Sequence, residues 1–501
     1  MNKPIKKVVI VGGGTAGWMT AALLKKVLGT IVDIELIESE DIGRIGVGEA
    51  TIPPIRYLND VLGIDETEFL RETKATIKLA IKFDNWHKQG DSYFHTFGAA
   101  GKPIAFCHFH HFWVRAKQMG DTSSLWDYDL NYLCATENKF APIIAKDPVL
   151  EMLYAYHFDA SLYAAFLRKF SEKIGVVRTE GLINQVGIHP DNGYIQSLTL
   201  KNGKTISGDL FVDCSGMRAL LIQQQLGTGY EDWSHWLPCD RAVAVPSERF
   251  VKTLPYTRAI AHSAGWQWRI PLQHRNGNGL VYSSNHYSDD EATNLLLTNI
   301  ESNALGEPNL IQFKTGRRLK QWNRNVIAIG LSSGFLEPLE STSIHLIQSA
   351  IVRLIKFFPH NGISPVNVAT YNRQSQKEFE QIRDFIIFHY HSNKRDDSRF
   401  WRDLRTMEIP ASLTQKISLF QSTGTLFREQ DDLFHDVSWL QVLLGQGVMP
   451  QDYHPLADNL TETQLKEMLV NIKKIKRGPL AQLPSHDDFL INVCGGGKKI
   501  N

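Results

Sequence analysis

The chain has 501 residues, of which 43% are hydrophobic, so it is long enough to bury a large core and to form more than one subdomain. Its 54 lysines and arginines are balanced by 53 aspartates and glutamates, which leaves a net charge of +1. This balance argues against nucleic-acid or membrane-surface binding as the main activity, and we expect neither partner.

Cysteine usage and the first residues indicate where the protein works. The five cysteines are scattered and show no CxxC spacing, which favours free thiols in a reducing compartment. The segment 1–14, MNKPIKKVVIVGGG, runs straight into a predicted strand and leaves no room for the apolar core of a signal peptide. No apolar run approaches the roughly 20 residues that span a bilayer. We therefore expect a cytoplasmic location.

The predicted elements begin with two buried strands and a helix. Continuous apolar runs at 7–12 and 32–38 predict strands buried on both faces, and a helix is expected at 16–28 between them. Residues 76–86, TIKLAIKFDNW, alternate between apolar and polar side chains. This alternation predicts a half-buried strand with Lys78 on its polar face.

The middle of the chain predicts more strands, and its end predicts helices. Further strands are expected at 194–200, 209–216, 266–272, 279–287 and 325–330. After about residue 370 the pattern becomes helical, most clearly at 372–390 and 461–476. The fold class that follows is α/β: a body at 1–370, then a smaller, mainly helical region at 371–501.

Residues 12–17, GGGTAG, match the dinucleotide motif G-x-G-x-x-G between a strand and a helix. Gly12 permits the tight turn, Gly14 lets the backbone approach a pyrophosphate, and Gly17 lets helix and strand pack closely. The second strand ends at Glu38, where an acid accepts hydrogen bonds from a ribose. The alternative is a glycine-rich turn without a ligand. The predicted cofactor-binding residues of this part are Gly12, Gly14, Thr15, Ala16, Gly17 and Glu38.

The layout after the second strand favours FAD over a nicotinamide cofactor. An irregular stretch, IGRIGVGEATIPP, follows, and the next strand of dinucleotide-binding type is DLFVDCSG, about 170 residues further on. This interruption resembles the FAD-dependent monooxygenase class. A late strand of that class normally ends in Gly-Asp, whereas this chain has Gly330-Leu331-Ser332.

Four motifs together resemble the tryptophan-halogenase family of flavin-dependent halogenases. They are GGGTAGW at 12–18, GVGEAT at 46–51, W-x-W-x-I-P at 266–271 and GFLEPLEST at 334–342. The third motif distinguishes these halogenases from hydroxylating relatives. The resemblance implies an FAD-binding Rossmann-like body of the flavin monooxygenase/halogenase type at 1–370 and a helical region at 371–501 that contributes to the substrate site. It adds Gly48, Glu49 and Ala50 to the cofactor-binding residues.

The resemblance also implies the reaction and its partners. Reduced FAD, supplied by a separate NAD(P)H-dependent flavin reductase, and oxygen convert chloride or bromide into hypohalous acid. Lys78 occupies the position of the catalytic lysine, which hydrogen-bonds that acid or forms a haloamine with it. Without the resemblance, periodicity alone favours a solvated strand lysine, as Lys82 is.

The GFLEPLEST motif supplies the remaining catalytic residues. The resemblance places Glu340 beside the reacting carbon, where a carboxylate stabilises the cationic intermediate and takes its proton. It assigns halide binding to the backbone N–H groups of Thr342 and Ser343. The family usually has glycine at the position of Ser343. Glu337 and Pro338 are expected to shape the turn. From the residues alone, this stretch is a helix N-cap preceded by surface acids.

The predicted substrate is an indole-type aromatic. The resemblance assigns His95, Phe97 and Phe434 to its binding, and aromatic walls suit an indole. Segment 428–447 corresponds to the part that grips the amino-acid backbone in tryptophan halogenases, but it has Gln430 where a carboxylate is expected and His435 where a tryptophan is usual. An indole without the amino-acid group is therefore favoured. Glu429 and Asp431, which flank the position, keep the alternative open.

Other interpretations are weighed against this one. A regioselective free-tryptophan halogenase, a flavin-dependent hydroxylase and a non-enzymatic flavin-binding protein share the FAD body. The cluster at 107–113, CHFHHFW, allows a metal interpretation with two histidines on one face of a strand, but it lacks an acidic or cysteine partner, so we expect a packed aromatic wall and no metal. The protein is expected to be a monomer or a homodimer.

Overall fold

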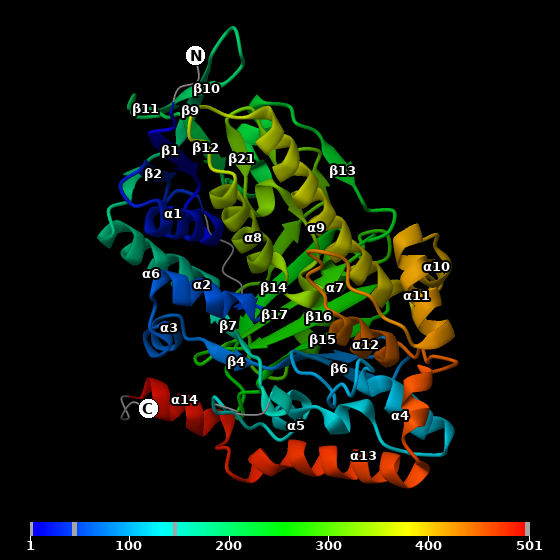
Figure 1. The fold of residues 1–501 in the computed structure, drawn as a ribbon. Helices are drawn as coiled ribbons and strands as arrows, with labels where there is room; N and C mark the ends of the chain where they lie inside the picture. The colour runs from blue at the N-terminus through cyan, green and yellow to red at the C-terminus, as the bar shows by residue number, and fades with distance from the viewer. Residues whose placement is uncertain (1–3, 43–47, 144–147, 496–501) are drawn as a thin grey trace. The chain divides into compact units, whose positions relative to one another are not determined.

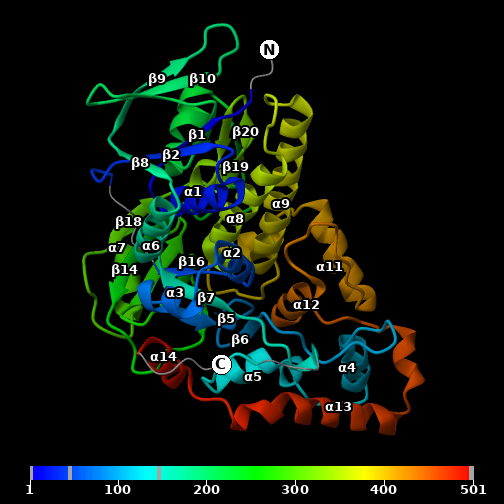
Figure 2. The ribbon, with the colours of Figure 1, turned by 60° about the vertical axis from the view of Figure 1, so that its left-hand side comes forward.

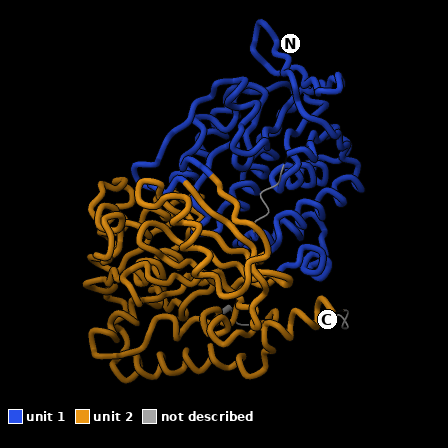
Figure 3. Tube along the Cα trace, turned by 180° about the vertical axis from the view of Figure 1, so that it is seen from behind, with its two compact units in different colours: residues 1–75, 158–240, 312–380 blue, residues 76–157, 241–311, 381–501 orange. Residues whose placement is uncertain are grey.

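The computed structural model describes residues 4–42, 48–143 and 148–495. Two compact units are formed, each from three segments of the chain (Figure 3). Unit 1 comprises residues 1–75, 158–240 and 312–380, and unit 2 comprises residues 76–157, 241–311 and 381–501. These units do not coincide with a body at 1–370 and a region at 371–501, and that functional division stays a prediction. The first two residues of the GVGEAT motif lie outside the described residues.

Unit 1 is built on a six-stranded sheet with the order β20-β21-β12-β1-β2-β8. The central strand β1 is parallel to β2 and β12, and its valines and isoleucine are buried on both faces, as its apolar run predicts. Only the short edge strand β20 runs antiparallel to its neighbour. The strands are β1 (Lys7–Val11), β2 (Asp33–Glu38), β8 (Val177–Glu180), β12 (Leu210–Asp213), β20 (Trp322–Asn323) and β21 (Val326–Ala328).

Helices cover this sheet, and α1 lies against both α6 and α8 (Figure 1). The helices of unit 1 are α1 (Thr15–Leu28), α2 (Pro54–Leu62), α3 (Glu66–Glu72), α6 (Ala160–Lys173), α8 (Ser343–Lys356) and the first part of α9 (Pro365–His391). Two small sheets complete the unit. One contains β9 (Ile183–Ile188), β10 (Ile195–Leu200) and β11 (Thr205–Ser207), and the other contains β13 (Tyr230–Asp232), β19 (Gly316–Arg318) and β22 (Gly334–Phe335).

Unit 2 contains a seven-stranded sheet with the order β18-β14-β17-β16-β15-β5-β6. Neighbouring strands from β14 to β15 are antiparallel, while β15 and β5 are parallel. The predicted strand at 279–287 begins and ends earlier, as β17. The strands are β5 (Ala80–Asp84), β6 (Ser92–Thr96), β14 (Arg241–Ser247), β15 (Tyr256–His262), β16 (Gly265–Pro271), β17 (Asn276–Tyr282) and β18 (Asn309–Gln312).

The predicted half-buried strand at 76–86 is wrong in two respects. The segment forms two strands, β4 (Thr76–Lys78) and β5, and nearly every side chain in both is buried. β4 pairs with β7 (Ala155–Asp159), whereas β5 pairs with β15 and β6. The chain changes partner at Leu79, whose N–H donates to the carbonyl of Pro255 (2.8 Å). Protein therefore covers both faces, which alternation alone does not reveal.

The chain after residue 365 is helical, as predicted. Helix α13 lies along α4 and α5 (Figure 2). The helices of unit 2 are α4 (Phe109–Gln118), α5 (Leu130–Thr136), α7 (Asp289–Asn299), α10 (Arg399–Thr406), α11 (Ala411–Thr423), α12 (Asp436–Gly445), α13 (Glu462–Arg477) and α14 (His486–Cys494), together with the end of α9. Among the described residues, no helix combines the length and the apolarity needed to cross a bilayer.

Candidate active site

The glycine loop between β1 and α1 has the geometry of a dinucleotide cradle. Gly12 has a φ of +114°, and a Cβ there would lie 2.3 Å from the carbonyl oxygen of Cys214. A Cβ on Gly17 would lie 1.8 Å from the carbonyl oxygen of Gly12. Both positions therefore require glycine, one for the turn and the other for close packing. At Gly14, by contrast, a Cβ would meet no atom within 4 Å. The loop is open on the side where a pyrophosphate would approach.

The start of α1 also suits an anionic ligand. Gly14 is the N-cap residue and offers no side-chain hydrogen bond, so the first turn, which begins with Thr15 and Ala16, keeps backbone N–H groups available. Trp18, one turn further along, buries its indole Nε1 without a hydrogen-bond partner among the described residues. The residues present are those that an FAD pyrophosphate needs.

Glu38 lies beside this loop but is already engaged by arginines. Its Oε1 accepts a hydrogen bond from Arg178 (2.6 Å) and lies 3.6 Å from Arg168. A Cβ on Gly13 would lie 1.6 Å from Glu38 Oε2, so the carboxylate rests directly on the glycine loop. A ribose hydroxyl at Glu38 would share the carboxylate with these cations. The sequence predicted neither arginine: Arg178 is on β8, which pairs with β2 but was not among the predicted strands.

The predicted residues Gly48, Glu49 and Ala50 form a short strand, β3 (Gly48–Ala50). Gly48 and Ala50 are buried. Burial raises the pKa of Glu49 to about 7, so this carboxyl group is neutral in a large fraction of molecules at neutral pH. A neutral carboxyl group can donate a hydrogen bond as well as accept one.

Glu340 is buried, which corrects the simpler interpretation as a surface acid before a helix. Pro338–Glu340 form a single 3₁₀ turn, and the side chain of Glu340 is 1% exposed. The following residue, Ser341, adopts a left-handed conformation with a φ of +59°. This turn ends the segment and lets α8 begin at Ser343.

The two predicted halide-binding residues lie at the start of α8. Thr342 is the N-cap, but it makes no side-chain capping bond, and its buried hydroxyl has no partner among the described residues. Ser343 is the first helical residue, and the positive φ of this segment falls on Ser341. Serine in place of the family's glycine therefore strains nothing at Ser343. Helix N-terminal amides of this kind attract anions.

A buried charge cluster ties α8 to α9. Glu378 of α9 is contacted by His345 Nε2 (3.3 Å), Arg353 (2.7 Å) and the hydroxyl of Ser349 (2.9 Å), all from α8. Burial alone would raise the pKa of Glu378, but the hydrogen bond from His345 and the charge of Arg353 outweigh it and lower the pKa to about 2. The sequence did not predict this cluster, which holds α8 against α9.

Lys78 is fully buried in unit 2, at the end of β4. Its Nζ lies 5.2 Å from the centre of the Phe97 ring, a cation–π distance. Burial, reinforced by the charge of Lys78, holds the pKa of His157 well below its usual value, so this neighbour is neutral. Lys82, in contrast, is partly exposed and pairs with Asp84 (2.9 Å). The two lysines of this segment therefore have different environments.

The strand that carries Lys78 is held by polar contacts on both sides. The Thr76 hydroxyl donates to the carbonyl of Pro271 (2.7 Å), the last residue of the W-x-W-x-I-P motif, and lies 3.0 Å from His157 Nδ1. The N–H of Ile77 donates to Nε2 of His486 on α14 (3.1 Å). These bonds fix the backbone on which Lys78 is mounted.

Two of the three predicted substrate residues, His95 and Phe434, belong to one aromatic wall in unit 2. His95 on β6 is near the rings of Phe385 (5.7 Å) and Phe434 (6.3 Å), and these two phenylalanines stack at 3.8 Å. Phe97 follows β6, and its N–H donates to the carbonyl of Leu79, next to Lys78. The lysine and the wall are therefore joined through the β5–β6 pair.

The two tryptophans of the W-x-W-x-I-P motif are core residues. Trp266 is near the rings of Trp86 (6.3 Å) and Trp268 (6.2 Å), and both motif tryptophans are buried on β16. A Cβ on Gly279 of the paired strand would lie 2.0 Å from the Trp268 ring. The motif therefore depends on a glycine that the neighbouring strand supplies.

The histidine-rich cluster at 107–113 is not a strand, which corrects that expectation. It enters α4, with His108 as its N-cap. His110 bonds to the carbonyl of Gly424 (2.7 Å), and its burial lowers its pKa to about 3. Across the described ranges, no group of three or more metal-ligating side chains is arranged to hold an ion.

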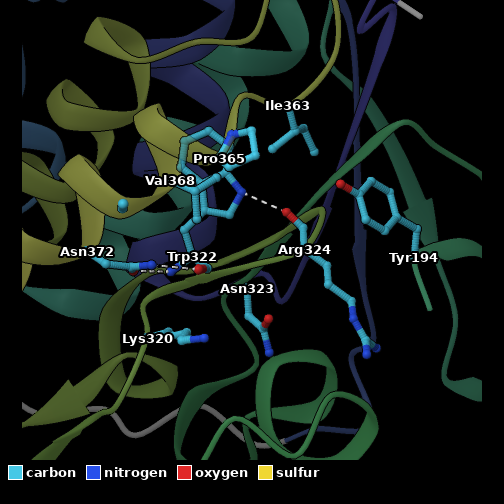
Figure 4. A pocket seen from close by; sticks show the side chains of 10 residues that line it. Tyr194, Lys320, Trp322, Asn323, Arg324, Ile363, Pro365, Val368 and Asn372 are labelled. Atoms are coloured by element: carbon cyan, nitrogen blue, oxygen red, sulfur yellow. Dashed lines mark hydrogen bonds between the residues drawn. The ribbon is translucent and has the colours of Figure 1, made fainter. Parts of the chain in front are cut away.

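A shallow hollow of about 330 Å³ lies in unit 1 (Figure 4). Two basic side chains, Lys320 and Arg324, contribute to it, and the indole Nε1 of Trp322 donates to the backbone carbonyl of Arg324 (2.9 Å). Asn372 of α9 exchanges two hydrogen bonds with the backbone of Trp322. The lining includes none of the predicted site residues.

Comparison with known proteins identifies the family. The family model for tryptophan halogenase matches residues 7–462. A tryptophan 7-halogenase, RebH from Lentzea aerocolonigenes, is 35% identical, over 98% of this chain and 99% of its own. Two solved flavin-dependent halogenases are also similar. Xcc4156 from Xanthomonas campestris is 47% identical with a TM-score of 0.96, and BrvH from Brevundimonas sp. BAL3 is 42% identical with a TM-score of 0.94, each with 98% of this chain and 99% of its own covered.

This chain therefore belongs to the tryptophan halogenase family, and it is a flavin-dependent halogenase. The resemblance and the α/β fold class predicted from the sequence are confirmed. Membership implies FAD, a halide ion, a flavin reductase and a small aromatic substrate. The roles of individual residues remain to be proposed and tested.

The glycine loop generates a prediction that separates binding from folding. Gly14→Ala places a methyl group in the open space and should weaken FAD binding at least about tenfold with little change in melting temperature. Gly12→Ala should instead destabilise the fold by about 1–3 kcal/mol, because of its left-handed backbone and the contact with Cys214. Both are measured by FAD titration and thermal unfolding.

Gly306→Ala is the matched control, since a Cβ at this exposed glycine would also meet nothing within 4 Å. It should change neither quantity. Unaltered FAD affinity in Gly14→Ala would show that the cofactor does not approach this loop.

The charge cluster on α8 predicts an acid-dependent stability. Because the pKa of Glu378 is lowered in the folded state, its stabilisation is complete above its unfolded pKa of about 4.5 and is lost as pH falls toward about 2. A shift of this size corresponds to roughly 3 kcal/mol. Glu378→Gln should therefore lower stability at pH 7 and flatten its loss between pH 4.5 and 2 in urea unfolding. An unchanged acid limb would contradict the assignment.

Proposed function

We propose that this enzyme brominates or chlorinates an indole-type aromatic that lacks the amino-acid group of tryptophan. The observation that carries the proposal is Lys78, a fully buried lysine next to an aromatic wall. Fully buried lysines are rare unless they are paired or functional. Lys78 occupies the position of the family's catalytic lysine, and we assign that function to it.

The cofactor supplies one chemical capability to this reaction. Reduced FAD together with oxygen provides the two-electron oxidation that turns a halide ion into hypohalous acid. The loop at Gly12, Gly14 and Gly17, with Glu38, would hold its pyrophosphate and ribose. The amides at Thr342 and Ser343 would hold the halide, because helix N-terminal N–H groups stabilise negative charge.

Lys78 receives the hypohalous acid and keeps it from reacting elsewhere. Its ammonium group donates a hydrogen bond to the hypohalous oxygen, or its neutral amine forms a haloamine. In the hydrogen-bonded form the aromatic carbon takes the halogen, the O–X bond breaks, and the oxygen takes a proton from the ammonium group and leaves as water. A haloamine has already released that water when it formed, so its N–X bond breaks in the transfer and the amine of Lys78 is restored.

Glu340 completes the substitution. The carbon that accepts the halogen loses aromaticity and bears positive charge until its proton leaves. A carboxylate stabilises this cation and accepts the proton. Its burial strengthens both effects, because charges interact more strongly away from water.

Substrate choice is proposed from the aromatic wall and the segment that follows it. His95, Phe97 and Phe434 offer ring faces to an indole. Gln430, at the position predicted to hold an ammonium group, is exposed and uncharged. This combination supports an indole without a charged side chain.

A free-tryptophan halogenase is the second candidate, favoured by the 35% identity to a tryptophan 7-halogenase. One assay decides between the two. The enzyme is supplied with reduced FAD from a flavin reductase, oxygen and bromide, and mass spectrometry compares brominated indole with brominated tryptophan. We expect the larger kcat/KM for indole and no product without the reductase. A larger value for tryptophan would overturn the substrate proposal, and oxygenated product without bromide would indicate a hydroxylase.

The two lysines of segment 76–86 provide a matched test. Lys78→Met removes the amine but keeps an apolar chain in a buried position, and it should reduce brominated product at least about 100-fold with FAD affinity unchanged. Lys82→Met should reduce turnover less than about threefold, because Lys82 pairs with Asp84 and is partly exposed. Equal effects of the two substitutions would refute the role of Lys78.

Glu340→Gln tests the carboxylate. Glutamine keeps the shape but removes both the charge and the basic site, so turnover should fall at least about tenfold with FAD affinity little changed. Glu337→Gln, three residues earlier in the same turn, is the control for local damage and should be milder. Near wild-type turnover in Glu340→Gln would leave the buried acid with a purely structural role.

A further inference from the structure

A buried ion pair joins α11 to the segment that precedes α12. Lys416 of α11 is 8% exposed and Asp432 is 4% exposed, and the lysine Nζ lies 3.4 Å from the Asp432 Oδ2. Neither Lys416 nor Asp432 belongs to the four motifs that identify the family of this chain. The two residues are 16 positions apart, on different elements.

The lysine end of the pair is enclosed on several sides. Its Nζ lies 4.6 Å from the centre of the Trp439 ring and 4.9 Å from that of Phe427, both cation–π distances. It also donates to the carbonyl of Phe427 (3.4 Å). Rings, a carbonyl and a carboxylate therefore hold the ammonium group in place.

This enclosure is continuous with the aromatic wall. Trp439 meets Phe385 edge-on, with ring centres 4.7 Å apart. Phe385 stacks on Phe434 at 3.8 Å, and Phe434 lies 6.3 Å from His95. The ion pair thus stands at the end of the wall that we propose binds the indole ring.

The charge state of the pair determines what else this region can bind. An amino-acid or amine substrate needs a carboxylate for its ammonium group. The flanking acids Glu429 and Asp431 are exposed, so Asp432 is the buried acid of this segment. Burial raises the pKa of its carboxyl group, and the charge and the hydrogen bond of Lys416 oppose that shift.

We infer that the Lys416–Asp432 pair is a specificity determinant: the chain's own ammonium group occupies the carboxylate that a substrate ammonium would need, which selects indoles without a positive side chain. The inference rests on the proposed indole-type substrate. A tethered lysine competes with a substrate amine at very high effective concentration. The pair also presents no net charge to the ring site.

The test compares two substrates in the same enzyme sample. The measured quantity is kcat/KM for tryptamine divided by kcat/KM for indole, which does not depend on the fraction of enzyme that is folded. Lys416→Met should raise this ratio at least about tenfold, because Asp432 then becomes available to the tryptamine ammonium. Lys416→Arg keeps a cation on Asp432 and should change the ratio less than about threefold. The double variant Lys416→Met/Asp432→Asn should return the ratio close to the wild-type value.

The reciprocal variant examines the other partner. Asp432→Asn leaves Lys416 without its carboxylate, so indole-3-acetate should gain on indole by at least about fivefold while tryptamine does not gain. This measurement stands even where Lys416→Met fails to fold.

An unchanged ratio of tryptamine to indole in Lys416→Met would overturn the inference. So would a wild-type activity on indole-3-acetate that Lys416→Met selectively loses, because Lys416 would then be a carboxylate-binding residue. If the wild-type enzyme brominates indole and Lys416→Met leaves the tryptamine-to-indole ratio unchanged, this inference alone is contradicted. Wild-type enzyme that brominates neither indole nor tryptamine contradicts the proposed function as well.

Discussion

The constraint on which this structure depends is a lysine without exposed surface. Removing an ammonium group from water costs several kcal/mol unless nearby groups compensate. The chain meets that cost at one short strand, whose backbone is held by Thr76, by His486 of α14 and by its pairing with β7. The aromatic ring of Phe97 and a histidine kept neutral contribute to the surroundings of Lys78.

The two compact units hold different parts of the proposed chemistry. Unit 1 contains the glycine loop, Glu38 and the start of α8, which are suited to a dinucleotide and an anion. Unit 2 contains Lys78 and the aromatic wall, which are suited to an oxidant and a flat substrate. The chain changes unit at residue 76, where β4 begins, so the proposed catalytic lysine, Lys78, lies two residues after that change. Glu340, the proposed proton acceptor of the halogenation step, also belongs to unit 1.

Sequence alone predicted the parts of the site that depend on local rules. The glycine loop follows from the backbone requirements of Gly12 and Gly17, and the buried strand β1 from its apolar run. The burial of Lys78 was not predictable from alternation, because the second face of the strand is covered by segments distant in sequence. The same reason hid Arg178 beside Glu38 and the pair of Lys416 and Asp432, whose partners meet only through the tertiary fold.

We propose that Lys78 directs hypohalous acid to the substrate after halide has been oxidised. The direct measurement is the partition of oxidised bromide between indole and a diffusible scavenger such as monochlorodimedone, at equal oxygen consumption, in wild type and Lys78→Met. We expect that wild type gives mainly brominated indole, whereas the variant brominates the scavenger and forms almost no brominated indole. An unchanged partition in the variant would contradict this role of Lys78.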